Sequence, residues 1–595
     1  MAGNVYGPPI VGQGAQGRFP LLPLVITLLL VLTIPIGSGL TSLLDLSSVV
    51  SFLLALGLVP LLAWALIIRR ERFYPTGLRA NVPEGLLGLL AAWGVASMLW
   101  SEQESVTLCA IQPLVLASAL CWVLTSARLP AAHRTVLLKA WVLLAMAMSI
   151  HAVAQFFGLE PLFESGFLGQ RGGSILPHPN VLGGHLAVTL PLVGLAYPGV
   201  KGRDRWLRYG IAASLMLGTI ATLSRAALLA VFVSMLLLWW LNKRGRLRKL
   251  SVHEKPGRIA PILFVVGGGI ALLAMVLLSA KTEHGRFLSV LGISGRTRLA
   301  LWSAAGKMFT DAPILGHGYG SFPLLAPAYR PDSLAELHPD GNIFFKTTHS
   351  EYFQQISEVG IIGLALLLGL IVSLFRRTSR DLANRDSAQE RTSTCIIAAL
   401  TALVIHSLLN SSLRFPILLF DMILLMVLSR ASATGETSRK RLGHSRLARW
   451  AEMAGSAVLV VGVVFFLHDS GTRALSTAFY DLGKHHLHAG ESDLADLQLQ
   501  RSLGLYPGNI EARYLLASRH FAKAEYSLAY REYLGVWREA PYFTNVLFDL
   551  GVCALQLERP GVARSWFFRS RALNPYREDT LKALELIGKE PPREK

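Results

Sequence analysis

Histidine and arginine residues next to apolar stretches are the side chains of this chain best placed to do chemistry. His349 stands in the run Thr348-His349-Ser350-Glu351, and Arg225 in the run Ser224-Arg225-Ala226 between two apolar stretches. An imidazole titrates near neutral pH and can take a proton from a hydroxyl group. A guanidinium presents a planar fork that matches phosphate oxygens. These residue types predict a hydroxyl nucleophile and a phosphorylated ligand.

Long apolar helices must position these residues. Of the 595 residues, 52% are hydrophobic and only 16% charged, and the mean hydropathy is +0.45. A soluble chain would carry roughly 25% charged residues. Backbone in lipid must satisfy its own hydrogen bonds, so runs of about 20 apolar residues predict membrane-spanning helices. About thirteen such runs are present, near 20–37, 47–68, 85–100, 106–125, 136–157, 179–197, 207–222, 225–241, 259–280, 358–375, 394–410, 415–429 and 452–468.

The positive charge of the chain reflects its membrane topology. The net charge is +19, and the basic residues concentrate in short loops such as 69–72, 243–249, 376–377 and 439–441. Short basic loops face the cytoplasm, so we predict a cytoplasmic N-terminal tail over residues 1–19 and a periplasmic C-terminus. This distribution argues against nucleic-acid binding.

Three regions follow from the hydropathy pattern. Residues 20–468 form the predicted membrane unit, with a large periplasmic loop at 281–349, and residues 469–595 form a polar, helix-rich tail. In the tail Pro507, Pro541 and Pro575 are spaced by 34 residues, the period of tetratricopeptide repeats. We therefore predict a tetratricopeptide-like helical domain that serves for packing or interaction, with a generic helical tail as the alternative.

Several polar residues converge on the predicted outer face of the membrane. We expect His349 to act as a base and Arg225 and Arg296 to bind a pyrophosphate, because two guanidinium groups can hold this anion without a metal or a nucleotide. The supporting residues that we expect on this face are Arg171, Asn180, Arg298 and Glu358. The structural alternatives are an arginine that snorkels to the interface and a histidine that caps a helix. We expect no metal site, since HExxH and CxxC spacings are missing from the sequence.

Four ordered motifs resemble those of the O-antigen ligase/polymerase superfamily over about residues 80–430. They are Arg171-Gly172-Gly173-Ser174 with Pro179-Asn180, Ser224-Arg225-Ala226, the stretch Gly295-Arg296-Thr297-Arg298 through Gly316-His317-Gly318-Tyr319-Gly320, and His349-Ser350 with Gln354 and Glu358-Val359-Gly360. The Gly316–Gly320 run by itself predicts a tight turn, because the strand and helix of a dinucleotide loop do not flank it.

The resemblance implies an all-α, GT-C-type membrane glycosyltransferase in the bacterial inner membrane. Its donor would be an undecaprenyl-pyrophosphate-linked glycan, with His349 as the base on the acceptor hydroxyl and Arg225 and Arg296 on the pyrophosphate. Transfer would invert the anomeric carbon and need neither metal nor cofactor.

The acceptor stays open between lipid A-core, another glycan and a protein hydroxyl. The stretch from His406 to Pro416 is similar to the protein O-oligosaccharyltransferase branch, but Arg414 stands where that branch usually has a glutamate. The thirteenth span and the tail are additions to the ligase plan, and the tail would recruit an acceptor or a protein partner. A lipid-linked glycan transporter or flippase is the alternative of another class, and a membrane scaffold is a third.

Overall fold

The computed structural model describes most of the chain as helices. The described residues are 51, 55–58, 82–126, 131–159, 171–174, 176, 178–198, 202–248, 287–337, 345–382, 387–432, 446–543 and 545–588. Over these ranges the elements are α-helices and short 3-10 helices, without a strand. The protein is an all-α polytopic membrane protein, as its composition predicted.

Seven described helices are long and apolar enough to cross a membrane, over 82–99, 104–125, 131–156, 179–196, 225–243, 351–380 and 389–409. They include α3 (Val82–Ala96), α4 (Glu104–Ser126), α5 (Ala131–Phe156), α6 (Pro179–Thr189), α9 (Arg225–Arg248), α14 (Glu351–Leu382) and α15 (Ser387–Leu409). Three further predicted spans are also helices, namely α8 (Gly202–Ala221), α16 (Pro416–Ser432) and α17 (Arg446–His488). The predicted spans at 20–37 and 259–280, and most of 47–68, lie outside the described residues.

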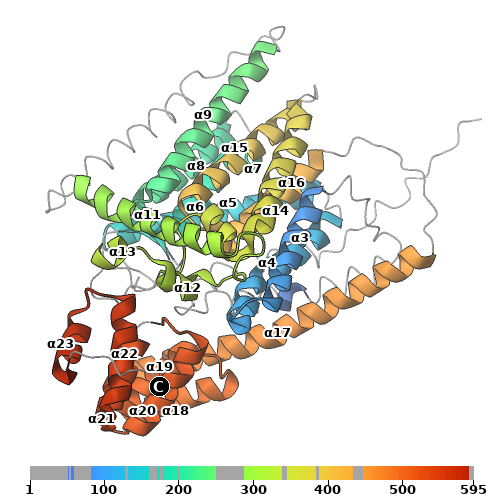
Figure 1. Cartoon of the computed structure of the whole chain (residues 1–595). Helices are drawn as coiled ribbons and strands as arrows, with labels where there is room; N and C mark the ends of the chain where they lie inside the picture. Colours follow the sequence, from blue (N-terminus) through green and yellow to red (C-terminus); the bar gives the residue numbers. More distant parts are fainter. Residues whose placement is uncertain are drawn as a thin grey trace, which may run out of the picture.

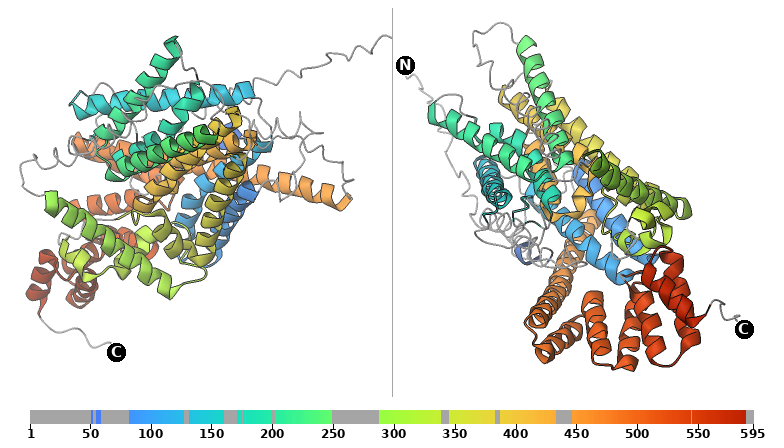
Figure 2. Two further views of the ribbon diagram at one scale, coloured as in Figure 1. Left: turned by 90° about the horizontal axis from the view of Figure 1, so that it is seen from above. Right: turned by 90° about the vertical axis from the view of Figure 1, so that its left-hand side faces the viewer.

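The spans pack into one bundle around a shared apolar core (Figure 1). Helices α6 and α16 lie inside it, and their side chains are almost all buried. Helix α6 starts where it does because His178 caps it and Pro179 occupies its first turn, where no backbone N–H is needed. Helix α11 (Phe287–Asp311) crosses the bundle and packs against α14 (Figures 1 and 2).

A kink in α14 receives the glycine-rich turn that follows α11. Gly360 interrupts α14 with a φ of 65°, and the backbone of this kink pairs with residues 313–318. The N–H of Ile361 donates to Pro313 O (2.9 Å), and the N–H of Gly318 donates to Glu358 O (2.8 Å). A Cβ atom at Gly360 would overlap the carbonyl of Ile314. The close approach therefore requires glycine, and the predicted tight turn is present.

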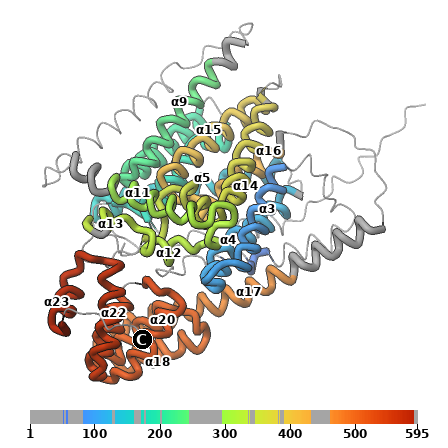
Figure 3. The backbone as a smooth tube through the Cα atoms, in the orientation of Figure 1, coloured from blue at the N-terminus to red at the C-terminus, as the bar shows by residue number. Residues whose placement is uncertain are grey.

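The tail consists of helix pairs that pack one against the next (Figure 3). Helices α18 (Ser492–Leu505), α20 (Tyr526–Glu539) and α22 (Pro560–Leu573) each have 14 residues and start 34 residues apart. Gly490, Ala524 and Glu558 adopt left-handed φ values of 80°, 61° and 57° at the same spacing. The intervening helices are α19 (Ile510–Ala522), α21 (Val546–Gln556) and α23 (Glu578–Ile587). The repeat in the sequence is thus a repeat of helical hairpins.

Helix α17 joins the membrane unit to the tail without a break. It runs through the predicted boundary at residue 468 and packs against α18 as the first helix of the repeat array. Its residue Asp469 pairs with Arg473 (2.8 Å) and accepts a hydrogen bond from Gln112 of α4. The tail lies beside α12 (Phe322–Tyr329) and α13 (Asp332–Leu337), the short helices that follow the glycine-rich turn (Figure 1).

Candidate functional site

His349 sits in a strained turn just before α14. Its φ is 56°, a conformation that costs a residue with a side chain about 1 kcal/mol or more. The neighbouring Thr348 holds the turn: its N–H donates to Gln354 Oε1 (2.7 Å), and its carbonyl accepts from Trp302 Nε1 (3.0 Å). The imidazole of His349 is half-buried and makes no hydrogen bond to any other described residue. The fold thus fixes the backbone and leaves the side chain available.

Three arginines from separate elements converge near this turn. Arg171 precedes α6, Arg225 begins α9, and Arg298 lies on α11. Arg171 donates to Thr222 O through Nε (3.0 Å) and to Asn180 Oδ1 through Nη2 (2.9 Å). These bonds attach the 171–174 segment both to the α8–α9 turn and to the start of α6.

The three arginines act on one another electrostatically. Burial lowers the pKa of Arg171, and the charges of Arg225 and Arg298 lower it further. Burial lowers the pKa of Arg298, with Arg225 adding to the effect. The guanidinium of Arg298 is half-buried and has no hydrogen-bond acceptor in the described part of the chain. Repelling, partly desolvated cations form a site that an anion would stabilise.

The same positive charges act on two histidines. Burial, and then the charge of Arg298, lower the pKa of His349 to about 4. The pKa of His178 falls to about 3, through burial and then Arg171, His349 and Arg298. Both imidazoles are therefore neutral at neutral pH. His178 also accepts from the N–H of Asn180 through Nδ1 (3.0 Å). His178 directly precedes the Pro179-Asn180 motif, and its charge state depends on Arg298, which is distant in the chain.

Arg296 is not brought into this cluster. It is exposed, whereas Arg298 is half-buried. Successive residues of an α-helix are turned by about 100°, so positions two apart face nearly opposite sides. Of the two arginines in the Gly-Arg-Thr-Arg motif, the structure places Arg298 beside Arg171 and Arg225. The sequence-based assignment of Arg296 to the anion stays a prediction.

Asn180 and Glu358 organise the surroundings of the site. Asn180 donates to Asn410 Oδ1 (3.3 Å), and His406 bonds both to Asn180 O (3.1 Å) and to Ser412 Oγ (2.8 Å). These contacts attach the start of α6 to the connection between α15 and α16. The sequence did not single out Asn410, because an asparagine that ends a helix is unremarkable without its partners.

Glu358 is fully buried and links the site to the glycine-rich turn. It accepts from the N–H groups of Gly320 (2.7 Å) and Phe322 (3.3 Å), and from Gln354 Nε2 (2.5 Å). It also forms an ion pair with Arg414, whose guanidinium lies over the ring of Tyr319 (3.7 Å). Arg414, which departs from the protein-glycosylating motif, therefore neutralises Glu358. Glu358 positions the backbone through this network.

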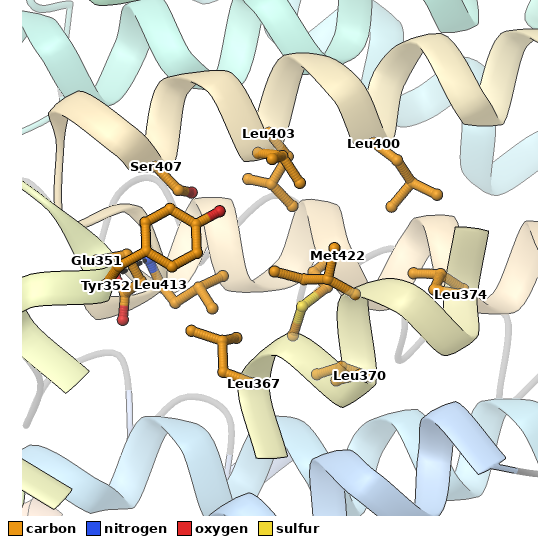
Figure 4. A pocket seen from close by; sticks show the side chains of 12 residues that line it. Glu351, Tyr352, Leu367, Leu370, Leu374, Leu400, Leu403, Ser407, Leu413 and Met422 are labelled. Carbon is orange, nitrogen blue, oxygen red and sulfur yellow. Dashed lines mark hydrogen bonds between the residues drawn. The ribbon is translucent and has the colours of Figure 1, made fainter. Parts of the chain in front are cut away.

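An apolar pocket opens beside the site between α14, α15 and α16. Glu351, Tyr352 and Ser407 lie at one end, and leucines such as Leu374 and Leu400 at the other (Figure 4). Glu351 and Tyr352 follow His349 by two and three residues. The polar end of the pocket is thus adjacent to the His349 turn, and its wall is aliphatic over the remaining length.

A comparison with protein families finds a match over part of this region. Residues 210–368 match the family model described as O-antigen ligase. This part of the chain is thus similar to the O-antigen ligase family. The matched region contains Arg225, Arg298, His349 and Glu358, whereas Arg171 and the tail lie outside it. A search of curated proteins gave no match.

Proposed function

We propose that the protein transfers a glycan from a lipid-linked pyrophosphate to a hydroxyl acceptor on the periplasmic face of the bacterial inner membrane. The observation that carries this proposal is Arg298, a half-buried guanidinium without a hydrogen-bond acceptor among the described residues, next to two further arginines and a neutral histidine. Such a cluster favours an anion that bears several oxygens. The match to the O-antigen ligase family supports the reaction class.

In the proposed step His349 takes the proton from the acceptor hydroxyl. The hydroxyl oxygen forms a bond to the anomeric carbon of the donor sugar, while the bond from that carbon to the pyrophosphate oxygen breaks. The lipid pyrophosphate leaves with the bonding electrons, and Arg171, Arg225 and Arg298 stabilise its charge. Direct displacement inverts the anomeric carbon. Because the arginines supply the positive charge, the proposed step uses no metal.

The low pKa of His349 is consistent with a donor that binds before the proton is transferred. A pKa of about 4 keeps the imidazole unprotonated before the donor binds. The pyrophosphate would neutralise part of the Arg298 charge, which raises the pKa of His349 and strengthens it as a base. Donor binding would thereby activate the base that acts on the acceptor.

The pocket of Figure 4 is too small for the isoprenoid chain of an undecaprenyl-type donor. That chain would lie in the lipid beside the apolar helices. The tail, which we interpret as tetratricopeptide-like, would recruit the acceptor or a protein partner.

The acceptor distinguishes the alternatives within this class. O-antigen ligation to lipid A-core and polymerisation of a polysaccharide follow from the family match, while glycosylation of a protein hydroxyl follows from the stretch between His406 and Pro416. The chain uses Arg414 to pair with Glu358, so the site differs from that protein-glycosylating motif where the usual glutamate is missing. We therefore favour a glycan or lipid A-core acceptor. A transporter or flippase for lipid-linked glycans is the alternative of another class.

The test is complementation of a deletion strain with His349→Ala, followed by staining of envelope glycan. We expect loss of the mature glycan at normal protein levels, and no loss with His485→Ala, an exposed tail histidine. Full glycan with His349→Ala would refute the assignment. In proteoliposomes loaded with lipid-linked glycan extracted from the host, a transferase releases free lipid pyrophosphate, whereas a flippase only changes the leaflet of the donor.

A further inference from the structure

The segment that carries Arg171 lies against the last turns of α5. The side chain of Gln155, on α5, accepts hydrogen bonds through Oε1 from the N–H of Gly173 (3.1 Å) and from the N–H of Ser174 (2.7 Å). Its Nε2 donates to the carbonyl of Ser174 (3.3 Å). Gln155 is only 6% exposed, and the segment belongs to no helix. One buried amide side chain thus supplies the hydrogen-bond partners that the backbone of this segment needs.

The preceding turn of α5 also receives this segment. A Cβ atom at Gly172 would overlap the carbonyl oxygen of Ala152, so the two backbones approach this closely because residue 172 is a glycine. The imidazole of His151 bonds through Nδ1 to the hydroxyl of Ser174 (3.1 Å). Ser174 has a left-handed φ of 55°, which a residue with a side chain keeps only where its surroundings hold it. Helix α5 therefore fixes the conformation of the segment.

The position of Arg171 follows from this contact. On the side away from α5, the N–H of Gly172 donates to the carbonyl of Ala221 (2.9 Å), the last residue of α8. Arg171 donates to the carbonyl of the next residue, Thr222 (3.0 Å). A contacting group that is displaced by about 1 Å can lower a reaction rate about 100-fold. The hold of α5 on the segment thus bears on how well Arg171 meets an anion.

We propose that Gln155 is a positioning residue of the donor site. It holds the 171–174 segment on α5 and thereby sets the place of the Arg171 guanidinium. Gln155 contacts no substrate and acts through Arg171. The inference rests on the proposed function, which makes Arg171 a ligand of the lipid-linked pyrophosphate. The contact between Gln155 and the segment can be tested separately.

The experiment is a double-mutant cycle on the full-length protein in detergent, with Gln155→Met, Arg171→Ala and both changes together. Hydrogen–deuterium exchange at the amides of Gly173 and Ser174 reports the contact, and the initial rate of transfer from host-extracted lipid-linked glycan reports the function. We expect Gln155→Met to raise the exchange at least tenfold, because both N–H groups lose their acceptor. It should lower kcat/KM for the donor at least fivefold. In the Arg171→Ala background the same change should alter kcat/KM less than twofold, because the guanidinium that Gln155 positions is gone.

Three further variants control the interpretation. Gly172→Ala disturbs the same contact without a change at Gln155, since the added methyl group meets the carbonyl of Ala152, and it should reproduce both effects. The test therefore does not depend on the folding of a single variant. Gln155→Glu keeps an oxygen facing the two N–H groups, so the exchange should stay within threefold of the wild type. Gln498→Met replaces a glutamine of similar burial on α18 of the tail and should change neither quantity.

The outcomes separate the contact, the positioning role and the proposed function. Unchanged exchange in Gln155→Met and Gly172→Ala would overturn the contact. Raised exchange with an unchanged kcat/KM would overturn the positioning role. A loss of kcat/KM that is equally large in the Arg171→Ala background would also overturn it, because a purely structural role acts whether or not the guanidinium is present. If Arg171→Ala by itself kept full kcat/KM, the proposed function of Arg171 would fail, while the exchange would still decide the contact.

Discussion

Replacement of Arg298 should separate activity from stability. In the free protein this guanidinium is half-buried, and both burial and the charge of Arg225 lower its pKa. Its positive charge is therefore disfavoured until an anion binds. Arg298→Ala removes one of the repelling cations, so we expect a thermal midpoint equal to or above that of the wild type. The donor, in contrast, loses a charge-assisted contact.

The size of the loss follows from the strength of that contact. A hydrogen bond to a charged group contributes about 1.5–3 kcal/mol, and each 1.4 kcal/mol corresponds to a tenfold change in rate. Arg298→Ala should thus lower kcat/KM for the lipid-linked donor by about 10- to 150-fold. The kcat/KM of Arg298→Lys should lie between those of the wild type and of Arg298→Ala, since an ammonium keeps the charge but lacks the planar fork. The assay is the initial rate of transfer in detergent with host-extracted donor.

Arg296 provides a matched control on the same helix. It is exposed, and Arg296→Ala should leave kcat/KM within about twofold, as surface substitutions usually do. The reasoning is refuted if Arg296→Ala loses activity while Arg298→Ala retains it. A clear fall in the thermal midpoint of Arg298→Ala would also contradict the proposed repulsion.

Three other substitutions or conditions give defined outcomes. The acid limb of kcat/KM should lie near pH 4, because His349 titrates at about that value in the free protein. Its folded pKa lies below the ordinary value near 6.5, so its stability contribution is present above pH 6.5 and is lost as the pH falls toward 4. The thermal midpoint should therefore fall between pH 6.5 and pH 4, and a rise over this range would mean that the folded protein favours the charged imidazole. Gly360→Ala should lower the free energy of unfolding by about 2 kcal/mol or more, since a Cβ overlaps the carbonyl of Ile314, whereas Gly369→Ala meets only Leu86 at 3.6 Å and should be neutral or stabilising. Glu358→Gln leaves Arg414 without its carboxylate and should cost about 3–5 kcal/mol, much of it recovered by adding Arg414→Gln; equal stability of the single and double variants would contradict the pairing.

The sequence was sufficient for features that depend on local pattern. Apolar runs of sufficient length predicted the spans, because lipid imposes the same requirement on every helix. The 34-residue spacing of Pro507, Pro541 and Pro575 predicted the repeating hairpins, because each helix pair must bury its face on the next. The glycines between Gly316 and Gly320 predicted a tight turn, and all three adopt positive φ values.

Features that depend on distant partners were not predictable. Arg296 and Arg298 are equivalent in a motif, and only the rotation of α11 against the bundle decides which of them faces Arg225. Arg414 read as a departure from a related pattern, yet it completes the ion pair of Glu358, 56 residues away in the chain. Each of these charged residues acts through a partner that is distant in the sequence, and no local pattern contains that partner.

The distribution of charge explains why the site and its support can be distinguished. Glu358 and Arg414 neutralise each other, so these charges stabilise the fold without needing a ligand. The charges that act on Arg171 and Arg298 are those of other arginines. A chain that pairs its supporting charges but groups these cations retains an electrostatic cost that an anionic ligand would relieve. The unrelieved repulsion is therefore the feature that supports the proposed donor site, and the neutral His349 beside it is placed to act as the proposed base.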